Sequence, residues 1–133
     1  MNRIAFKEKH IDNMLFFNLV IDDNELSEIL NDGDFGIPAW LIDSGLPKLE
    51  EKEANGKPSN YIVTVCGCGE YGCGNSHCEI VWSDEVVIFR NFDGDSGNRP
   101  DIIFNFAKYQ FDNMVSQLCS KANAYKNQFD NGR

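Results

Sequence analysis

The C-terminal part of the chain carries one apolar stripe that predicts a long amphipathic helix. Between residues 107 and 125, apolar side chains recur at alternating steps of four and three residues, which is the spacing of one helix face. Asn105 can cap the start of this helix, and Lys121 and Lys126 suit the negative end of its dipole. Such a stripe needs a surface to pack on, and the preceding residues must supply it. The stripe consists of Ala107, Phe111, Val115, Leu118, Ala122 and Tyr125.

In the segments before this helix, successive side chains alternate in the two-residue pattern of β-strands. Residues 3–21 predict a hairpin whose strands are joined near His10 to Asn13. Further strand-like segments cover residues 60–68, 77–82, 85–92 and 101–106. The pattern predicts an α+β fold: an antiparallel sheet of about six strands, with a short helix in the N-terminal half and the long C-terminal helix packed on one face.

The short helix is expected directly after the hairpin. Asp22 can accept hydrogen bonds from backbone amides at the helix start, and Glu25 three residues later completes a capping-box-like pair. Leu26, Ile29 and Leu30 would then form its buried side. The prolines and glycines of residues 44–60 predict a long loop after it.

Length and composition indicate one soluble domain. A chain of 133 residues with 42% hydrophobic residues can bury a core of its own, so residues 1–133 are expected to form a single domain. Charges interrupt the first ten residues where a secretory signal would need an apolar run, and no stretch of about eighteen apolar residues occurs. We therefore expect a cytoplasmic protein whose thiols stay reduced.

Negative charge is concentrated in the first third of the chain. Residues 11–47 hold 8 of the 21 acidic residues and no lysine, arginine or histidine, which leaves 13 acids against 12 bases elsewhere. A segment of this kind repels phosphate backbones and anionic lipids, so we expect neither nucleic acid nor membrane as a partner. A basic protein domain would instead be attracted to it.

This charge predicts an acidic binding protein that neutralises a basic protein partner. An immunity protein that inhibits a nuclease-type toxin works in this way, because its carboxylates occupy the places where phosphates would bind. The alternative is that the acids only keep the domain soluble. The candidate partner-binding residues are Asp22, Asp23, Glu25, Glu28, Asp32 and Asp34.

Four of the five cysteines lie in one short segment, CGCGEYGCGNSHC, from Cys66 to Cys78. Four thiolates, or three together with one imidazole, can bind a tetrahedral zinc ion. The spacing differs from that of a zinc knuckle, which normally has two residues between paired ligands. The candidate ligands are Cys66, Cys68, Cys73, Cys78 and His77.

Two other interpretations of this segment stay open. A reactive thiol needs a base or a cation that lowers its pKa, whereas Glu70 and Glu79 beside these cysteines would raise it. The interspersed glycines permit close backbone approach, so the cysteines can simply fill a tight turn. We therefore expect no cofactor and lean toward a protein that is not an enzyme. A small zinc- or thiol-dependent enzyme or sensor is the alternative.

Other catalytic motifs are absent from the sequence. No phosphate-binding glycine motif and no HExxH or GxSxG motif occurs, and only two histidines are available for a catalytic triad. Asp93 and Asp95 have the spacing of a calcium loop, but its closing glutamate and central glycine are missing. We therefore expect residues 93–101 to be an ordinary loop.

Three segments together resemble a family of small, mostly uncharacterised bacterial proteins with a Cys-x-Cys-Gly-Glu-x-Gly-Cys core. These are VCGCGEYGCG, EVVIFRNF and FNFAKYQFDNMV, and LVIDDNELSEIL is similar to the early strand-and-helix segment of that family. The resemblance covers most of the chain and implies no established activity. The core of the family corresponds to Cys66, Cys68, Gly69, Glu70, Gly72 and Cys73.

Overall fold

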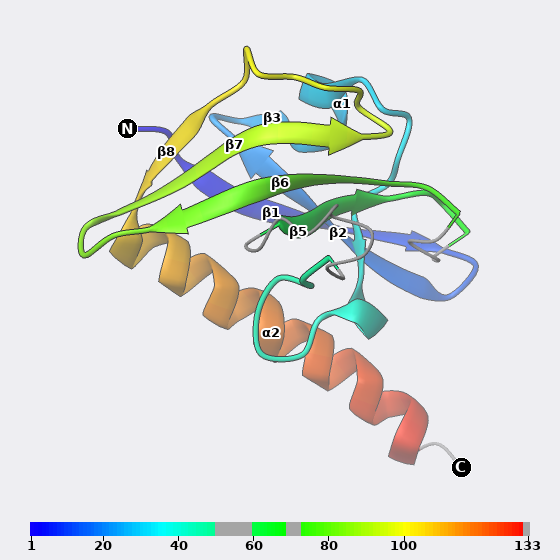
Figure 1. Ribbon diagram of the computed structural model, residues 1–133. Helices are drawn as coiled ribbons and strands as arrows, with labels where there is room; N and C mark the ends of the chain where they lie inside the picture. Colours follow the sequence, from blue (N-terminus) through cyan, green and yellow to red (C-terminus); the bar gives the residue numbers. More distant parts are fainter. Residues whose placement is uncertain (50–59, 69–72, 132–133) are drawn as a thin grey trace.

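The computed structural model describes residues 1–49, 60–68 and 73–131, which fold into two four-stranded antiparallel sheets and two helices (Figure 1). The α+β class is confirmed, but the single sheet of about six strands is wrong. One sheet contains β1 (Ile4–Ile11), β2 (Met14–Ile21), β3 (Asn24–Glu25) and β4 (Ile37–Pro38). The other contains β5 (Asn60–Val65), β6 (Asn75–Trp82), β7 (Val86–Gly94) and β8 (Phe104–Ala107). The helices are α1 (Leu26–Leu30) and α2 (Lys108–Asn131), and Ala39–Leu41 form a 3₁₀ turn.

The N-terminal hairpin is confirmed. β1 and β2 pair from Ile4 opposite Ile21 to Ile11 opposite Met14, which leaves two residues in the turn. Both of them, Asp12 and Asn13, have positive φ angles, of 50° and 70°. Two-residue turns of this kind match the right-handed twist of the strands, and aspartate and asparagine tolerate the left-handed conformation.

Backbone hydrogen bonds join the two sheets at two places. At one, Val65 of β5 donates to the Gly36 carbonyl at 2.8 Å and accepts from the Phe35 amide at 3.0 Å. At the other, the Asn2 amide donates to the Asn105 carbonyl at 2.8 Å, which forms a parallel bridge beside β8. The sheets therefore come close to a closed barrel, and a seam remains between β1 and β8.

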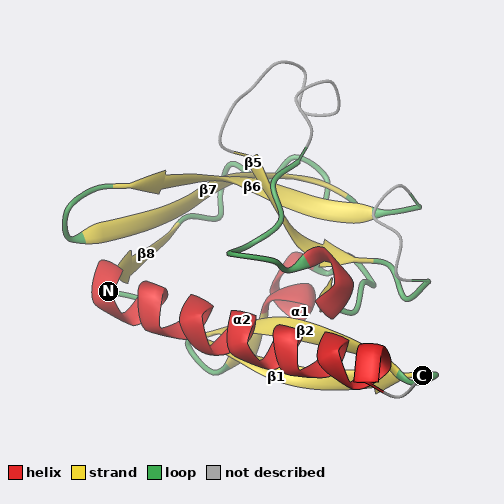
Figure 2. Cartoon of the chain, turned by 90° about the horizontal axis from the view of Figure 1, so that it is seen from below, coloured by secondary structure: helices red, strands yellow, loops and turns green. Residues whose placement is uncertain are grey.

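The helix α2 packs across both sheets (Figure 2). Its apolar stripe belongs to a core cluster that also includes side chains of both sheets, Phe17 and Phe89 among them. The ring of Phe111 lies 5.7 Å from that of Phe89, and Leu118 is fully buried. The predicted stripe is thus confirmed from Phe111 to Tyr125, and the helix continues past Tyr125. Ala107 ends β8, and Asn105 lies within β8, so its expected role as the helix cap is wrong.

The short helix forms, but its predicted cap is wrong. Asp22 lies in the turn between β2 and β3 with a φ of 51°, and it accepts from the Arg3 amide at 2.8 Å instead of from a helix amide. The N-cap position belongs to Glu25, whose side chain makes no capping bond. The helix ends at Asn31, which adopts a left-handed conformation, so α1 has only one turn and a half.

The predicted loop of residues 44–60 is described only in part. Residues 50–59 lie outside the described residues. Leu49 is buried against Ile62 and Val65, and its amide donates to the Asn60 carbonyl at 2.9 Å. Residues 44–49 thus hold to β5 by backbone and side chain. No helix in residues 1–49, 60–68 and 73–131 is both long and apolar enough to cross a membrane.

Replacing Leu118 by alanine is expected to lower the free energy of unfolding by about 2–5 kcal/mol, because the substitution leaves a cavity under α2. Ser120→Ala on the exposed side of the same helix is the matched control and should change it by less than about 0.5 kcal/mol. Urea denaturation at constant pH measures both values. Equal stability of the two variants would contradict the packing described for α2.

Candidate functional site

Three thiols meet at the end of the sheet where β5 passes into β6. The Sγ atoms of Cys66, Cys68 and Cys73 all lie within 4.8 Å of one another, and those of Cys66 and Cys68 are 2.8 Å apart. Cys66 is half-buried, whereas Cys68 and Cys73 are exposed. None of the five cysteines forms a disulfide. The structure therefore brings together three of the five predicted metal ligands, which we call the thiol cluster.

The backbone around the thiol cluster is held by close contacts. The Cys66 amide donates to the Gly74 carbonyl at 3.0 Å, which fixes the start of the turn against its end. A Cβ atom at Gly67 would lie 2.5 Å from the Phe35 ring, and one at Gly74 would lie 2.6 Å from a carboxylate oxygen of Asp95. A side chain at either glycine would therefore displace its neighbour, which agrees with the close approach that the sequence suggested for this turn.

The neighbouring sulfur atoms raise the affinity of Cys73 for its proton. Hydrogen bonding to Cys66 and Cys68 raises the pKa of Cys73 to about 12, and the like charges of their thiolates add to this effect. A cysteine nucleophile needs the opposite shift, because the thiolate is the reactive form. Cys73 is consequently a poor nucleophile by itself, while a cation bound between the sulfur atoms would stabilise the thiolates.

The other two predicted ligands lie elsewhere. Inward- and outward-facing residues alternate along β6, and Cys78 is one of the inward ones, fully buried in the core cluster. Burial raises the pKa of Cys78 well above its ordinary value, so it remains a thiol. His77 pairs with Ile62 of β5, and its Nδ1 lies 3.1 Å from Oδ1 of Asn75. Neither Cys78 nor His77 joins the thiol cluster. The strand alternation directs Cys78 into the core, and His77 lies on the opposite face of β6.

Asp32, Asp34 and Asp95 form a carboxylate cluster beside the ends of β5 and β6. Asp32 accepts from the Thr64 hydroxyl at 2.6 Å and from the Ser76 hydroxyl at 2.9 Å. Asp34 accepts from the same Thr64 hydroxyl at 3.2 Å. Thr64 and Ser76 are fully buried, so these bonds tie the segment of residues 32–36 to the ends of β5 and β6.

The carboxyl of Asp34 is the most perturbed acid of this cluster. Burial raises its pKa to about 7, and the hydrogen bond to Asp95 and the charges of Asp32 and Asp95 act in the same direction. Three like carboxylates in one place favour retention of a proton between two of them. The residues that sequence analysis missed here are Asp95, Thr64 and Ser76. The sequence indicated Asp95 only through its calcium-loop spacing from Asp93. Its partner Asp34 is 61 positions away in the chain, so no local pattern links the two.

The remaining predicted acids lie at the other end of β2 or on α1. Asp22 accepts from Arg3 and from Asn2, and the bond from the Arg3 amide is the main reason that its pKa is lowered. Asp23 pairs with the Arg3 guanidinium at 3.0 Å. Glu28 is exposed on α1.

Glu25 is already paired with bases of β1. Its carboxylate lies 2.6 Å from the Lys9 ammonium and 3.9 Å from that of Lys7. The Lys9 bond is the main cause of its lowered pKa. Of the six acids, only Asp32 and Asp34 share a cluster. Neutralisation of a basic partner, a nuclease-type toxin included, stays a prediction.

A comparison of the chain with known protein families, with curated proteins and with solved structures finds no match. The resemblance to the bacterial family with the Cys-x-Cys-Gly-Glu-x-Gly-Cys core therefore stays a prediction.

The raised pKa of Asp34 predicts that stability depends on pH. Between the ordinary value of 3.8 and the folded value of about 7, the folded protein keeps a proton on Asp34 that the unfolded chain has released. Stability from this proton is fully present below pH 3.8 and is lost as the pH rises through about 7. We therefore expect the free energy of unfolding to decrease across this window.

Asp34→Asn should flatten this dependence. The carboxamide can still donate to Asp95 and accept from Thr64, but it does not titrate. Asp84→Asn, in the exposed turn between β6 and β7, is the control and should leave the pH profile unchanged. Urea titrations at several pH values between 4 and 8 measure the effect. Parallel profiles for wild type and Asp34→Asn would contradict the assignment.

Proposed function

We propose that the protein binds a zinc ion through the thiolates of Cys66, Cys68 and Cys73. The observation that supports this is the meeting of three Sγ atoms within 4.8 Å. Zinc–sulfur bonds of about 2.3 Å in a tetrahedral site place the sulfur atoms about 3.8 Å apart. The thiol cluster needs only small side-chain rotations to reach that arrangement, mainly a widening of the 2.8 Å separation of Cys66 and Cys68.

The chemistry of the donors favours zinc over harder cations. Thiolates are soft ligands that select zinc and copper(I), whereas calcium and magnesium take oxygen ligands. A bound zinc ion deprotonates its thiol ligands, so it would displace the proton that the cluster retains on Cys73. Zinc would thus replace the hydrogen bonds to Cys66 and Cys68, and offset the like charges, that together raise the pKa of Cys73 to about 12.

The exposure of the cluster favours exchangeable binding. Cys68 and Cys73 are exposed, and among the described residues no other histidine, cysteine or acid belongs to the group. Structural zinc sites are closed by four protein ligands, whereas a site with three leaves a position for water or another ligand. A role in sensing or handling zinc fits these features better than a structural role does.

The other candidate functions have less support. A thiol-dependent enzyme would need a lowered cysteine pKa, and that of Cys73 is raised. Neutralisation of a basic partner would use acids that are separated on the fold, and Asp23 and Glu25 among them are already paired with bases. Zinc binding needs neither condition.

Zinc binding is tested by metal analysis of the full-length protein. Protein loaded with zinc and dialysed should retain about one equivalent. Cys73→Ser should lose it, and Cys119→Ser should retain it, because Cys119 lies on α2 outside the thiol cluster. Cobalt(II) in place of zinc should give thiolate charge-transfer absorption in wild type and in Cys119→Ser.

Circular dichroism of the metal-free proteins separates loss of binding from loss of folding. Cys73 is exposed, so Cys73→Ser should keep the wild-type spectrum and thermal midpoint without metal. The proposal fails if wild type retains no zinc, or if folded Cys73→Ser retains as much as Cys119→Ser.

A further inference from the structure

The outer edge of β1 carries backbone groups without partners. Just before β1, Arg3 accepts from the Asp22 amide, and the register of β1 with β2 repeats this orientation at every second residue. Odd-numbered residues of β1 therefore bond to β2, and the N–H and C=O groups of Ile4, Phe6, Glu8 and His10 point outward. Within residues 1–49, 60–68 and 73–131, β1 pairs with β2 alone, and the bridge of Asn2 with Phe106 lies before its first residue.

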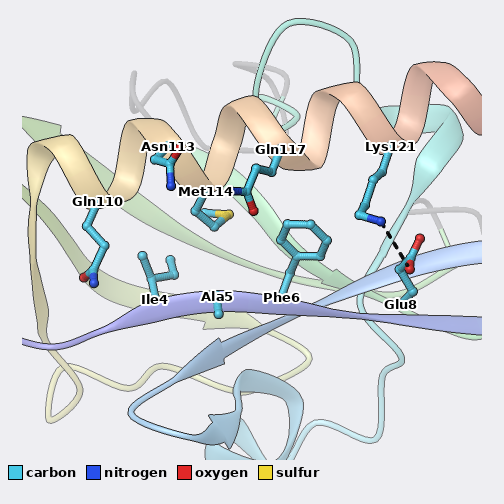
Figure 3. Close-up of a pocket in the computed structure, with 9 residues that line it drawn as sticks. All are labelled: Ile4, Ala5, Phe6, Glu8, Gln110, Asn113, Met114, Gln117 and Lys121. Atoms are coloured by element: carbon cyan, nitrogen blue, oxygen red, sulfur yellow. Dashed lines mark ion pairs between the residues drawn. The ribbon is translucent and has the colours of Figure 1, made fainter.

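The edge is open because the barrel fails to close here. The Asn2 amide, which also points outward, bonds to Asn105 beside β8. β8 ends at Ala107, and the chain continues into α2, which lies over the face of β1 that carries Ile4 and Phe6 (Figure 3). A helix has no backbone groups to offer a neighbouring strand, so pairing stops after Asn2.

A groove of about 440 Å³ separates β1 from α2. Ile4 and Phe6 point from β1 toward α2, where Met114 faces them (Figure 3). Ala5 also lines the groove although its side chain points to the other face, so the groove reaches the strand edge. Polar side chains of α2 line its upper side, and the pair of Glu8 and Lys121, 3.8 Å apart, marks one end.

We propose that this groove binds an extended peptide segment of another protein, which adds to β1 as a further strand. The outward N–H and C=O groups of β1 alternate along the edge, and another extended backbone matches that spacing. The added strand would continue the pairing that Asn2 begins. This binding is independent of the proposed zinc site, which lies at the end of β5.

Side chains on both faces of β1 define the peptide that fits. On the face toward α2, Phe6 and Met114 favour apolar residues at alternate positions of the peptide. On the other face, Lys7 is largely exposed, and its ammonium lies as far as 3.9 Å from Glu25. An acidic residue opposite Lys7 would therefore pair with it across the strands. The preferred segment alternates apolar and acidic residues.

A second copy of this chain fits the edge less well. Two copies of β1 related by a two-fold axis would pair antiparallel, with even-numbered residues opposite even-numbered ones. Centring the pair on residue 7 places Lys7 opposite Lys7, and centring it on residue 8 places Glu8 opposite Glu8. Centring it on residue 6 places Arg3 opposite Lys9. Like charges directly opposite are destabilising in each case.

The test uses a fluorescein-labelled peptide of alternating valine and glutamate, with blocked ends, and the full-length protein. Two control peptides carry N-methyl groups either on all valines or on all glutamates, which removes the amides along one edge only. In strand pairing, one control should bind at least about tenfold more weakly and the other should bind like the parent. Fluorescence anisotropy measures the three affinities.

Hydrogen exchange locates the bound peptide. The amides of Ile4, Phe6 and Glu8 should become protected on binding, whereas those of Ala5 and Lys7 are already bonded to β2 and should change little. Lys7→Glu should weaken the valine–glutamate peptide and strengthen a valine–lysine peptide.

Three results would overturn the proposal. One is lack of binding, or equal binding of both methylated peptides. Another is binding without protection of the even-numbered amides. The third is a dimer in analytical ultracentrifugation whose formation protects those amides, because the edge would then be occupied by a second copy.

Discussion

The junction between Val65 and residues 35–36 determines how the two halves of the molecule are arranged. Its two backbone hydrogen bonds join β5 to the segment that leads into β4, and so connect the sheets. The same junction places Asp32 and Asp34 beside Thr64, and Phe35 against Gly67. The thiol cluster and the carboxylate cluster therefore depend on one contact between segments about thirty residues apart in the chain.

Both clusters share one electrostatic property. Each gathers groups that would repel one another when ionised, and each responds by holding a proton, on Cys73 in one and on Asp34 in the other. At Asp34 burial is the main cause of the raised pKa, while at Cys73 the hydrogen bonds to the neighbouring sulfur atoms dominate. At this end of the protein, a carboxyl and a thiol are thus both held in their protonated form. A soft cation bound at the thiol cluster would convert its thiols to thiolates.

The sequence predicts those elements whose patterns are long. The stripe of α2 and the hairpin of β1 and β2 extend over many residues, and both were correct. The division into two sheets was not predictable from periodicity, because β3 and β4 have two residues each, too few to show a period. The cap of α1 failed for a similar reason, since Asp22 bonds to Arg3, which lies 19 residues earlier.

The candidate site was predictable in part. Proximity in the chain was enough to group Cys66, Cys68 and Cys73, because a short turn cannot separate them far. Cys78 was misplaced because its position depends on the alternation of β6, where Ser76, Cys78 and Ile80 all face inward. The contact of Asp34 with Asp95 depends on how two loops meet, and no local pattern encodes that meeting.

The bridge between Asn2 and Asn105 has a consequence for how the protein is made. The hydrogen bonds between these residues join positions 103 apart in the chain. The N-terminal hairpin therefore leaves the ribosome long before α2, which packs on it, has been synthesised. Until α2 has been synthesised, Phe6 and the other apolar residues of β1 face solvent. Contacts between distant residues also slow folding, because a long loop must close first. The nascent chain therefore passes through a state with an uncovered strand, in which a chaperone can recognise it.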